Sequence, residues 1–127
     1  MGSPAARPMP ERVVLVVDDE EMVCHLAARI LTEAGFRVVA AHDGSEALAL
    51  LAAFEGQVQL VVSDIAMPGM TGVQLAQTVT TRWPALPLLL MSGQSPGPDY
   101  VGRFLPKPFT TDSLLETVAA LVPAARH

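Results

Sequence analysis

Short apolar runs alternate along this chain with longer stretches whose apolar residues recur at helical spacing. The apolar runs are rich in valine and leucine and predict five β-strands, over residues 12–17, 36–41, 58–63, 86–91 and 103–106. The intervening and final stretches predict four helices, over about residues 23–34, 44–54, 71–82 and 111–122. Strands that alternate with helices are typical of βαβ units, so the pattern favours an α/β fold with a parallel sheet.

Residues at the ends of these stretches support the predicted helix bounds. Gly35 stands where the first helix needs a residue with positive φ, and Asp43 and Glu46 have the spacing of a capping box at the start of the second. The pair Trp83-Pro84 ends the third helix, because the residue before a proline is pushed toward extended conformations.

The crossover between the last two strands does not follow the alternation. It contains Pro96 and Pro98 together with three glycines, at positions 93, 97 and 102. Prolines remove backbone donors and disfavour helix at the preceding residue, so we expect an irregular loop in which a helix is absent or reduced to a turn. The fifth strand would then expose apolar area that a partner or a second copy of the chain can bury.

Length and composition place the chain among single globular domains. Its 127 residues predict one domain over 12–123, flanked by a disordered tail at 1–11 and a short C-terminal tail at 124–127. Half of the residues are hydrophobic, yet no apolar run approaches the roughly 18 residues of a membrane span. The net charge of −5 argues against direct nucleic-acid binding, and the single Cys24 fits a reducing compartment, so we expect a cytoplasmic protein.

Polar residues gather where the predicted strands end. Four acids at positions 18–21 follow the first strand, Asp64 follows the third, Ser92 the fourth and Lys107 the fifth. The carboxyl ends of parallel strands meet at one edge of a sheet, so these side chains are expected to converge. Converging carboxylates repel one another unless a cation joins them, and oxygen ligands favour Mg²⁺. Phosphate would be repelled here unless the metal and Lys107 were both present.

In this order the motifs resemble the receiver domain of two-component response regulators, from Val13 to about Val122. They are the paired acids in VVDDE, the segment DIAMPGMTG that begins at Asp64, Ser92 after the fourth strand, and Lys107-Pro108-Phe109 after the fifth. The resemblance implies a flavodoxin-like (βα)5 fold, with a five-stranded parallel sheet in the order 2-1-3-4-5. The sequences around Ser92 and Lys107 are similar to those of receivers attached to hybrid histidine kinases.

The same resemblance assigns roles at the phosphoryl site. Asp64 would be the phosphoacceptor, and Lys107 the cation beside the phosphoryl group. Asp19 and Asp64 would bind Mg²⁺ directly, together with the backbone carbonyl of Ala66, while Asp18 would act through water.

Further roles implied by the resemblance concern signalling. Ser92 and Phe104 would form a conformational switch, and the side chains at Ala66 and Gln94 would tune the lifetime of the phosphoryl group. The Lys107-Pro108 bond is expected to be cis, which places the lysine in the pocket.

The function implied is that of a phosphoacceptor, which assists its own phosphorylation and dephosphorylation without being an enzyme in the usual sense. Its donor would be a sensor histidine kinase or a histidine phosphotransfer protein. A second copy of the chain is a further expected partner, in a homodimer. A degenerate receiver that only binds would lack an acid, the hydroxyl or the lysine. A phosphatase of the haloacid dehalogenase type normally needs an acid where Ala66 stands, and a flavin phosphate would meet four consecutive acids.

Overall fold

The computed structural model describes residues 13–98, 100 and 102–122. Five parallel strands form one sheet in the order β2-β1-β3-β4-β5, which confirms the expected strand order. The strands are β1 Val13–Val17, β2 Arg37–Ala41, β3 Val58–Asp64, β4 Leu88–Ser92 and β5 Arg103–Pro106. The tails expected at 1–11 and 124–127 lie outside the described residues.

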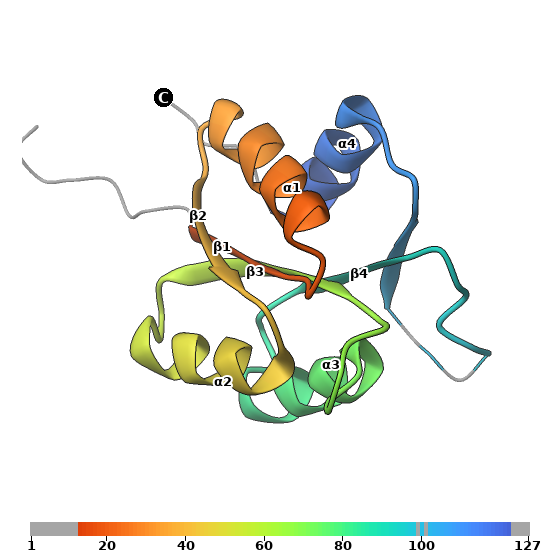
Figure 1. The fold of residues 1–127 in the computed structure, drawn as a ribbon. Helices are drawn as coiled ribbons and strands as arrows, with labels where there is room; N and C mark the ends of the chain where they lie inside the picture. Colours follow the sequence, from red (N-terminus) through yellow and green to blue (C-terminus); the bar gives the residue numbers. More distant parts are fainter. Residues whose placement is uncertain (1–12, 99, 101, 123–127) are drawn as a thin grey trace, which may run out of the picture.

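Helices cover both faces of the sheet (Figure 1). They are α1 Glu21–Glu33, α2 Gly44–Ala53, α3 Gly72–Arg82 and α4 Thr111–Leu121, all within a few residues of the predicted bounds. One apolar cluster joins the sheet to α1 and α4, and a second joins the opposite face to α2 and α3. Within the described parts of the chain, no helix has the length and apolar character to cross a membrane.

Strand β1 lies inside the sheet, between β2 and β3, and is buried along its whole length. Val14 and Val16 belong to the cluster under α1 and α4, whereas Leu15 and Val17 belong to the cluster under α2 and α3. Successive side chains of a strand point to opposite faces, so a strand covered on both sides needs apolar residues at every position. This explains the unbroken run VVLVV.

The cap of α2 differs from the expected capping box. The Asp43 carboxylate accepts a hydrogen bond from the backbone N–H of Glu46 at 2.8 Å, as expected. The Glu46 carboxylate accepts instead from the N–H of His42, one residue earlier than the reciprocal bond requires. Only half of the box is formed.

Two complete capping boxes occur at helices for which the sequence pattern predicted none. Thr71 and Gln74 exchange side-chain to backbone hydrogen bonds at the start of α3, and Thr110 and Ser113 do so at the start of α4. Each cap satisfies two backbone groups that a helix end leaves without partners.

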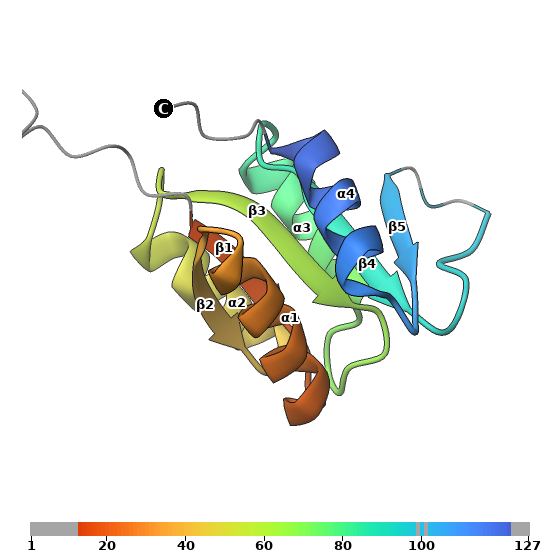
Figure 2. The ribbon, with the colours of Figure 1, turned by 90° about the horizontal axis from the view of Figure 1, so that it is seen from above.

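The crossover from β4 to β5 is a loop, as predicted from its prolines. Among the described residues of the segment 93–102, no helix occurs, and the N–H of Tyr100 donates to the carbonyl of Gly97 at 3.3 Å in a single turn. Figure 2 shows this loop extending beyond the edge strand β5.

The turn that follows β3 depends on a close backbone approach. The N–H of Gly72 donates to the carbonyl of Ile65 at 2.8 Å. A Cβ atom at Gly72 would collide with the backbone carbonyl of Asp64 and lie 2.9 Å from the Cα of Ile65. Both neighbours are backbone atoms, which cannot rotate away as a side chain would, so glycine is required here.

We therefore predict that Gly72→Ala lowers the free energy of unfolding by about 1 to 3 kcal/mol, the usual cost of overpacking. Gly93→Ala is the matched control, because nothing lies within 4 Å of the position that its Cβ would take and its φ is not positive. Urea unfolding of the two variants checks this. Equal stability of Gly72→Ala and wild type would contradict the close approach.

Candidate functional site

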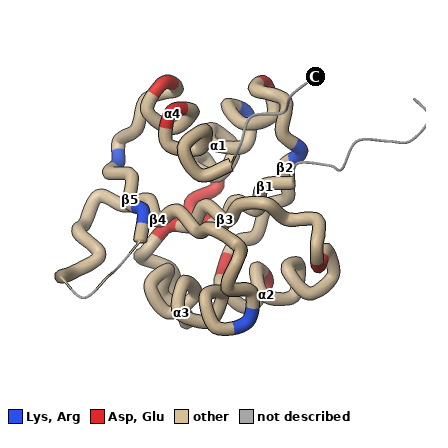
Figure 3. The backbone as a smooth tube through the Cα atoms, turned by 180° about the vertical axis from the view of Figure 1, so that it is seen from behind, with Lys and Arg blue, Asp and Glu red and all other residues tan. Residues whose placement is uncertain are grey.

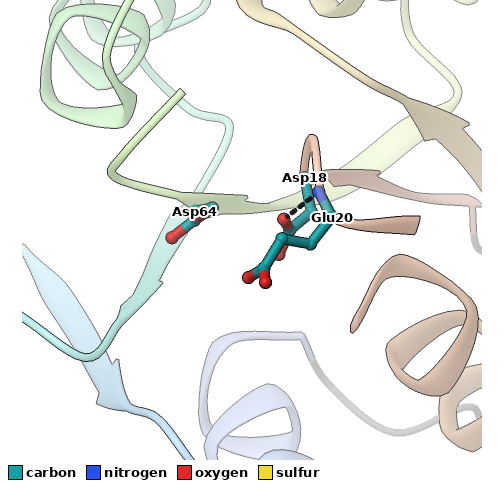
Figure 4. A group of neighbouring side chains, drawn as sticks. All are labelled: Asp18, Glu20 and Asp64. Atoms are coloured by element: carbon teal, nitrogen blue, oxygen red, sulfur yellow. Dashed lines mark hydrogen bonds between the residues drawn. The ribbon is translucent and has the colours of Figure 1, made fainter. Parts of the chain in front are cut away.

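The polar residues predicted at the strand ends meet at the carboxyl edge of the sheet. Asp18 directly follows β1, Asp64 is the last residue of β3, and Lys107 directly follows β5. Figure 4 shows Asp18, Glu20 and Asp64 gathered at the ends of these neighbouring strands. In Figure 3 the acidic segment that follows β1 lies in the middle of the molecule, with a basic segment next to β5.

Lys107 is the cation that holds these carboxylates together. Its Nζ lies 3.1 Å from Oδ2 of Asp18, 3.4 Å from Oδ1 of Asp64 and 3.7 Å from Oε1 of Glu20. Ligand atoms of the three acids all lie within 4.8 Å of one another. Three negative charges against one positive charge leave this group with an excess of two negative charges when all its members are ionised.

Burial differs sharply within the group. The side chain of Asp18 is fully buried and that of Asp64 is 7% exposed, whereas that of Glu20 is 65% exposed. A buried carboxylate loses its hydration and must be compensated by hydrogen bonds and opposite charge. Lys107 therefore matters most to the two aspartates, while solvent weakens its attraction to Glu20.

Backbone donors fix one oxygen of each aspartate. The N–H of Glu20 donates to Oδ1 of Asp18 at 2.9 Å, and the N–H of Ile65 donates to Oδ1 of Asp64 at 2.8 Å. The described residues place no hydrogen-bond donor on Oδ2 of Asp64, and their buried side-chain oxygens all have partners. Oδ2 of Asp64 is therefore not sealed off completely from solvent, although the side chain as a whole is only 7% exposed.

The electrostatics of the group raise two pKa values. Burial, and next the charge of Asp18, raise the pKa of Asp64, although Lys107 and the N–H of Ile65 act in the opposite direction. Burial alone would lower the pKa of Lys107, but its hydrogen bond to Asp18 and the charges of both aspartates outweigh that effect and raise it. Lys107 thus stays charged, while Asp64 resists ionisation more than an ordinary aspartate.

Ser92 connects this site to the β4–β5 loop. The residue is 3% exposed, and its Oγ accepts a hydrogen bond from the N–H of Gln94 at 3.0 Å. Its carbonyl accepts from the N–H of Lys107 at 2.9 Å. The Lys107-Pro108 bond is cis, which confirms that prediction.

The remaining predicted residues are not part of the acidic group. Asp19 is exposed and stands outside the group within the described chain, where Glu20 takes part instead. Ala66 and Gln94 are exposed, and Phe104 is half-buried on β5. Glu20 was not among the predicted metal ligands. The run of four acids was the signal for it, but spacing alone does not say which of them the turn after β1 directs inward.

Comparisons with known proteins agree on one family. The model of the response regulator receiver domain matches residues 14–119. The DNA-binding transcriptional regulator NtrC of Salmonella typhimurium is 36% identical over 126 residues, which are 94% of this chain and 26% of that protein. The sensor kinase CckA of Brucella abortus is 34% identical over 116 residues, 86% of this chain and 12% of that protein. This chain thus spans about a quarter or less of these relatives.

Solved structures share the fold over most of the chain. The receiver domain from the hybrid histidine kinase CckA has a TM-score of 0.76 and 35% identity, with 86% of this chain and 97% of that one covered. The chemotaxis protein CheY4 of Vibrio cholerae has a TM-score of 0.80 and 28% identity, with 88% and 99% covered.

The raised pKa of Asp64 predicts a stability effect in metal-free solution. The folded state holds the proton of Asp64 to higher pH than the unfolded state, so ionisation of this group destabilises the fold. The penalty is absent below the unfolded pKa, roughly 4, and grows as the pH rises through the folded pKa. Asp64→Asn should therefore be more stable than wild type at pH 7.

Urea unfolding with EDTA at several pH values between 4 and 7 measures this difference. We expect the advantage of Asp64→Asn to shrink toward pH 4. If Asp64→Asn is less stable than wild type at pH 7, the prediction is wrong. In that case the effect of Lys107 on the pKa of Asp64 outweighs the effects of burial and of the Asp18 charge.

Proposed function

The chain belongs to the response regulator receiver domain family of two-component systems, and from this we propose that Asp64 accepts a phosphoryl group from a phosphohistidine donor. The observation that carries the proposal is the placement of Asp64. One of its oxygens is held by Ile65 and Lys107, while the other accepts no hydrogen bond from the described residues at the carboxyl edge. Among the described residues, this combination suits a fixed nucleophile that an incoming partner can reach.

In the proposed reaction, Oδ2 of Asp64 forms a bond to phosphorus as the bond between phosphorus and the donor imidazole nitrogen breaks. The imidazole leaves with the electron pair, and Asp64 becomes an acyl phosphate. The Lys107 ammonium offsets charge on the phosphoryl oxygens, and positioning supplies much of the remaining rate. The donor is a sensor histidine kinase or a histidine phosphotransfer protein.

A divalent cation fits the acidic group. The group carries two excess negative charges and offers only oxygen ligands, which are the ligands that Mg²⁺ prefers. We propose that Asp64, Asp19 and the carbonyl of Ala66 hold Mg²⁺, with Asp18 acting through water. Bound Mg²⁺ would neutralise charge on the phosphoryl oxygens. The position of Glu20 within the acidic group makes it the competing ligand to Asp19.

Signalling is proposed to pass through Ser92 and Phe104. The Ser92 hydroxyl would turn toward the phosphoryl group and release the N–H of Gln94, from which it now accepts a hydrogen bond. Phe104 is half-buried, so in this proposal its ring would become more buried when the switch operates. The exposed side chains at Ala66 and Gln94 flank the approach of hydrolytic water in this proposal, and the small side chain at Ala66 leaves that approach open.

The rival functions fit the residues less well. A binding-only receiver is expected to have lost part of the site, yet Asp18, Asp64, Ser92 and Lys107 are all present. A phosphatase of the haloacid dehalogenase type normally needs a second acid at the position of Ala66. Net charge of −5 disfavours direct nucleic-acid binding. We further propose a cytoplasmic location and that a second copy of the chain can act as a partner.

Incubation with Mg²⁺ and acetyl phosphate should add one phosphoryl group to wild type, because the site supplies its own nucleophile and cation. The adduct should be labile in base, as an acyl phosphate is. Intact-mass spectrometry before and after alkaline treatment measures it. Asp64→Asn should gain no label, and equal labelling of this variant would refute the assignment of Asp64.

Metal ligation is tested by the Mg²⁺ dependence of the same labelling reaction. Asp19→Ala should abolish the dependence of labelling on Mg²⁺, because a direct ligand is lost. Asp18→Ala should have a smaller effect and lower the Mg²⁺ affinity by roughly 10- to 100-fold, as for a residue that acts through water. Glu20→Ala is the comparison variant and should change it least. Loss of Mg²⁺ dependence in Glu20→Ala with an unaffected Asp19→Ala would assign the ligand to Glu20.

A further inference from the structure

The loop between β3 and α3 carries two backbone groups that the proposed reaction needs. It comprises residues 65–71 and begins directly after Asp64. The N–H of Ile65 donates to Oδ1 of Asp64 at 2.8 Å, and the carbonyl of Ala66 is a proposed ligand of Mg²⁺. Both groups keep their positions only if the loop keeps its path, yet Met67 is its one buried residue. The contacts that hold this loop therefore bear directly on the site.

Two contacts anchor the base and the middle of the loop. At the base, the N–H of Gly72 donates to the carbonyl of Ile65 at 2.8 Å and brings the end of the loop back to its start. In the middle, Met67 is 7% exposed and belongs to the apolar cluster under α2 and α3. The part of the loop that follows Met67 needs an anchor of its own.

That anchor is a contact between Met70 and the start of α2. The N–H of Met70 donates to the carbonyl of Pro68 at 3.1 Å across a γ-turn, whose central residue, Gly69, has a φ of 81°. Met70 then lies against Gly44, the first residue of α2. A Cβ atom at position 44 would lie 2.7 Å from Sδ and 2.9 Å from Cβ of Met70. Both distances are too short for a carbon contact, so Met70 covers Gly44 completely on this side.

The contact explains why glycine stands at position 44. The φ of Gly44 is not positive, so other residue types could adopt the same backbone conformation. Glycine is also one of the poorest helix formers, and here it begins a helix. A larger side chain at position 44 would displace Met70. Because the Cβ of Met70 is fixed to its own backbone, the loop itself would have to move.

We infer that Met70 is a positioning residue for phosphoryl transfer to Asp64, and that its contact with Gly44 fixes the loop that carries the Ile65 N–H and the Ala66 carbonyl. The inference deepens the proposed function and rests on it. Met70 acts only through the backbone of the loop. A displacement of about 1 Å caused far from the reacting atoms can cost about 100-fold in rate, so a packing contact at this distance is sufficient.

Two variants disturb the contact from opposite sides. Met70→Ala removes most of the side chain that covers Gly44, whereas Gly44→Ala pushes Met70 and its loop away. Met70→Leu is the conservative variant, because it keeps an apolar side chain of similar volume. Met22→Ala is the matched control for the loss of a methionine side chain, since Met22 is 84% exposed on α1.

Hydrogen exchange of the Gly72 N–H measures how firmly the loop is held, with the N–H of Val16 in the buried strand β1 as the reference. Met70→Ala and Gly44→Ala should each lower the protection of Gly72 relative to Val16 by about tenfold or more, because local opening of the loop becomes easier. Met70→Leu and Met22→Ala should match wild type. Equal losses at Gly72 and Val16 would reflect a general loss of stability and would overturn the inference.

Calorimetric titration with Mg²⁺ and labelling with acetyl phosphate measure the consequence at Asp64. Met70→Ala should weaken Mg²⁺ binding by roughly tenfold, the lower end of the range for residues that support metal ligands. Labelling at saturating Mg²⁺ should slow by about tenfold or more. Met70→Leu should restore both quantities. Unchanged Mg²⁺ affinity and labelling rate in Met70→Ala, despite lost protection at Gly72, would overturn the positioning role.

Failure of wild type to bind Mg²⁺ or to become labelled counts against the proposed function instead. The exchange of the Gly72 N–H needs neither metal nor phosphoryl donor, so it still decides whether Met70 holds the loop.

Discussion

The rest of this structure depends on the ammonium group of Lys107, which compensates the charge of three neighbouring carboxylates. Asp18 is fully buried and Asp64 nearly so, and both depend on Lys107 for compensation. Removal of one partner from a buried ion pair leaves an uncompensated charge, which is far more costly than loss of an exposed pair. The backbone of Lys107 is held in turn by the carbonyl of Ser92, so Lys107, Ser92 and Asp64 are coupled through one set of contacts.

The strand order explains why these particular side chain types are needed. Asp18 and Asp64 come from β1 and β3, which are direct neighbours, and short side chains suffice to bring them together. Lys107 follows β5, and β4 lies between β5 and β3. Adjacent strands are about 4.8 Å apart, so only a long side chain spans the two intervals. A lysine after the edge strand meets this requirement.

Much of the fold and of the candidate site could be predicted from the sequence, because buried strands and the ends of parallel strands follow regular residue patterns. VVLVV had to be a strand covered on both faces, and polar residues at the ends of parallel strands had to meet at one edge. The prolines excluded a helix from the described part of the β4–β5 crossover. The inward placement of Glu20 rather than Asp19, and the bond from His42 to Glu46, depend on local turn geometry, which residue spacing does not encode. The cis Lys107-Pro108 bond was expected from family resemblance alone.

A crystal structure of the protein with Mg²⁺ and beryllofluoride, an analogue of the acyl phosphate, tests the central claim most directly. The account predicts beryllofluoride bonded to Oδ2 of Asp64, with Lys107 Nζ shifted from Asp18 toward its fluorine atoms and Ser92 Oγ turned away from Gln94. Beryllofluoride bound elsewhere, or Lys107 still bonded to Asp18 with Asp64 unmodified, would contradict the assignment of this edge as a phosphoryl site.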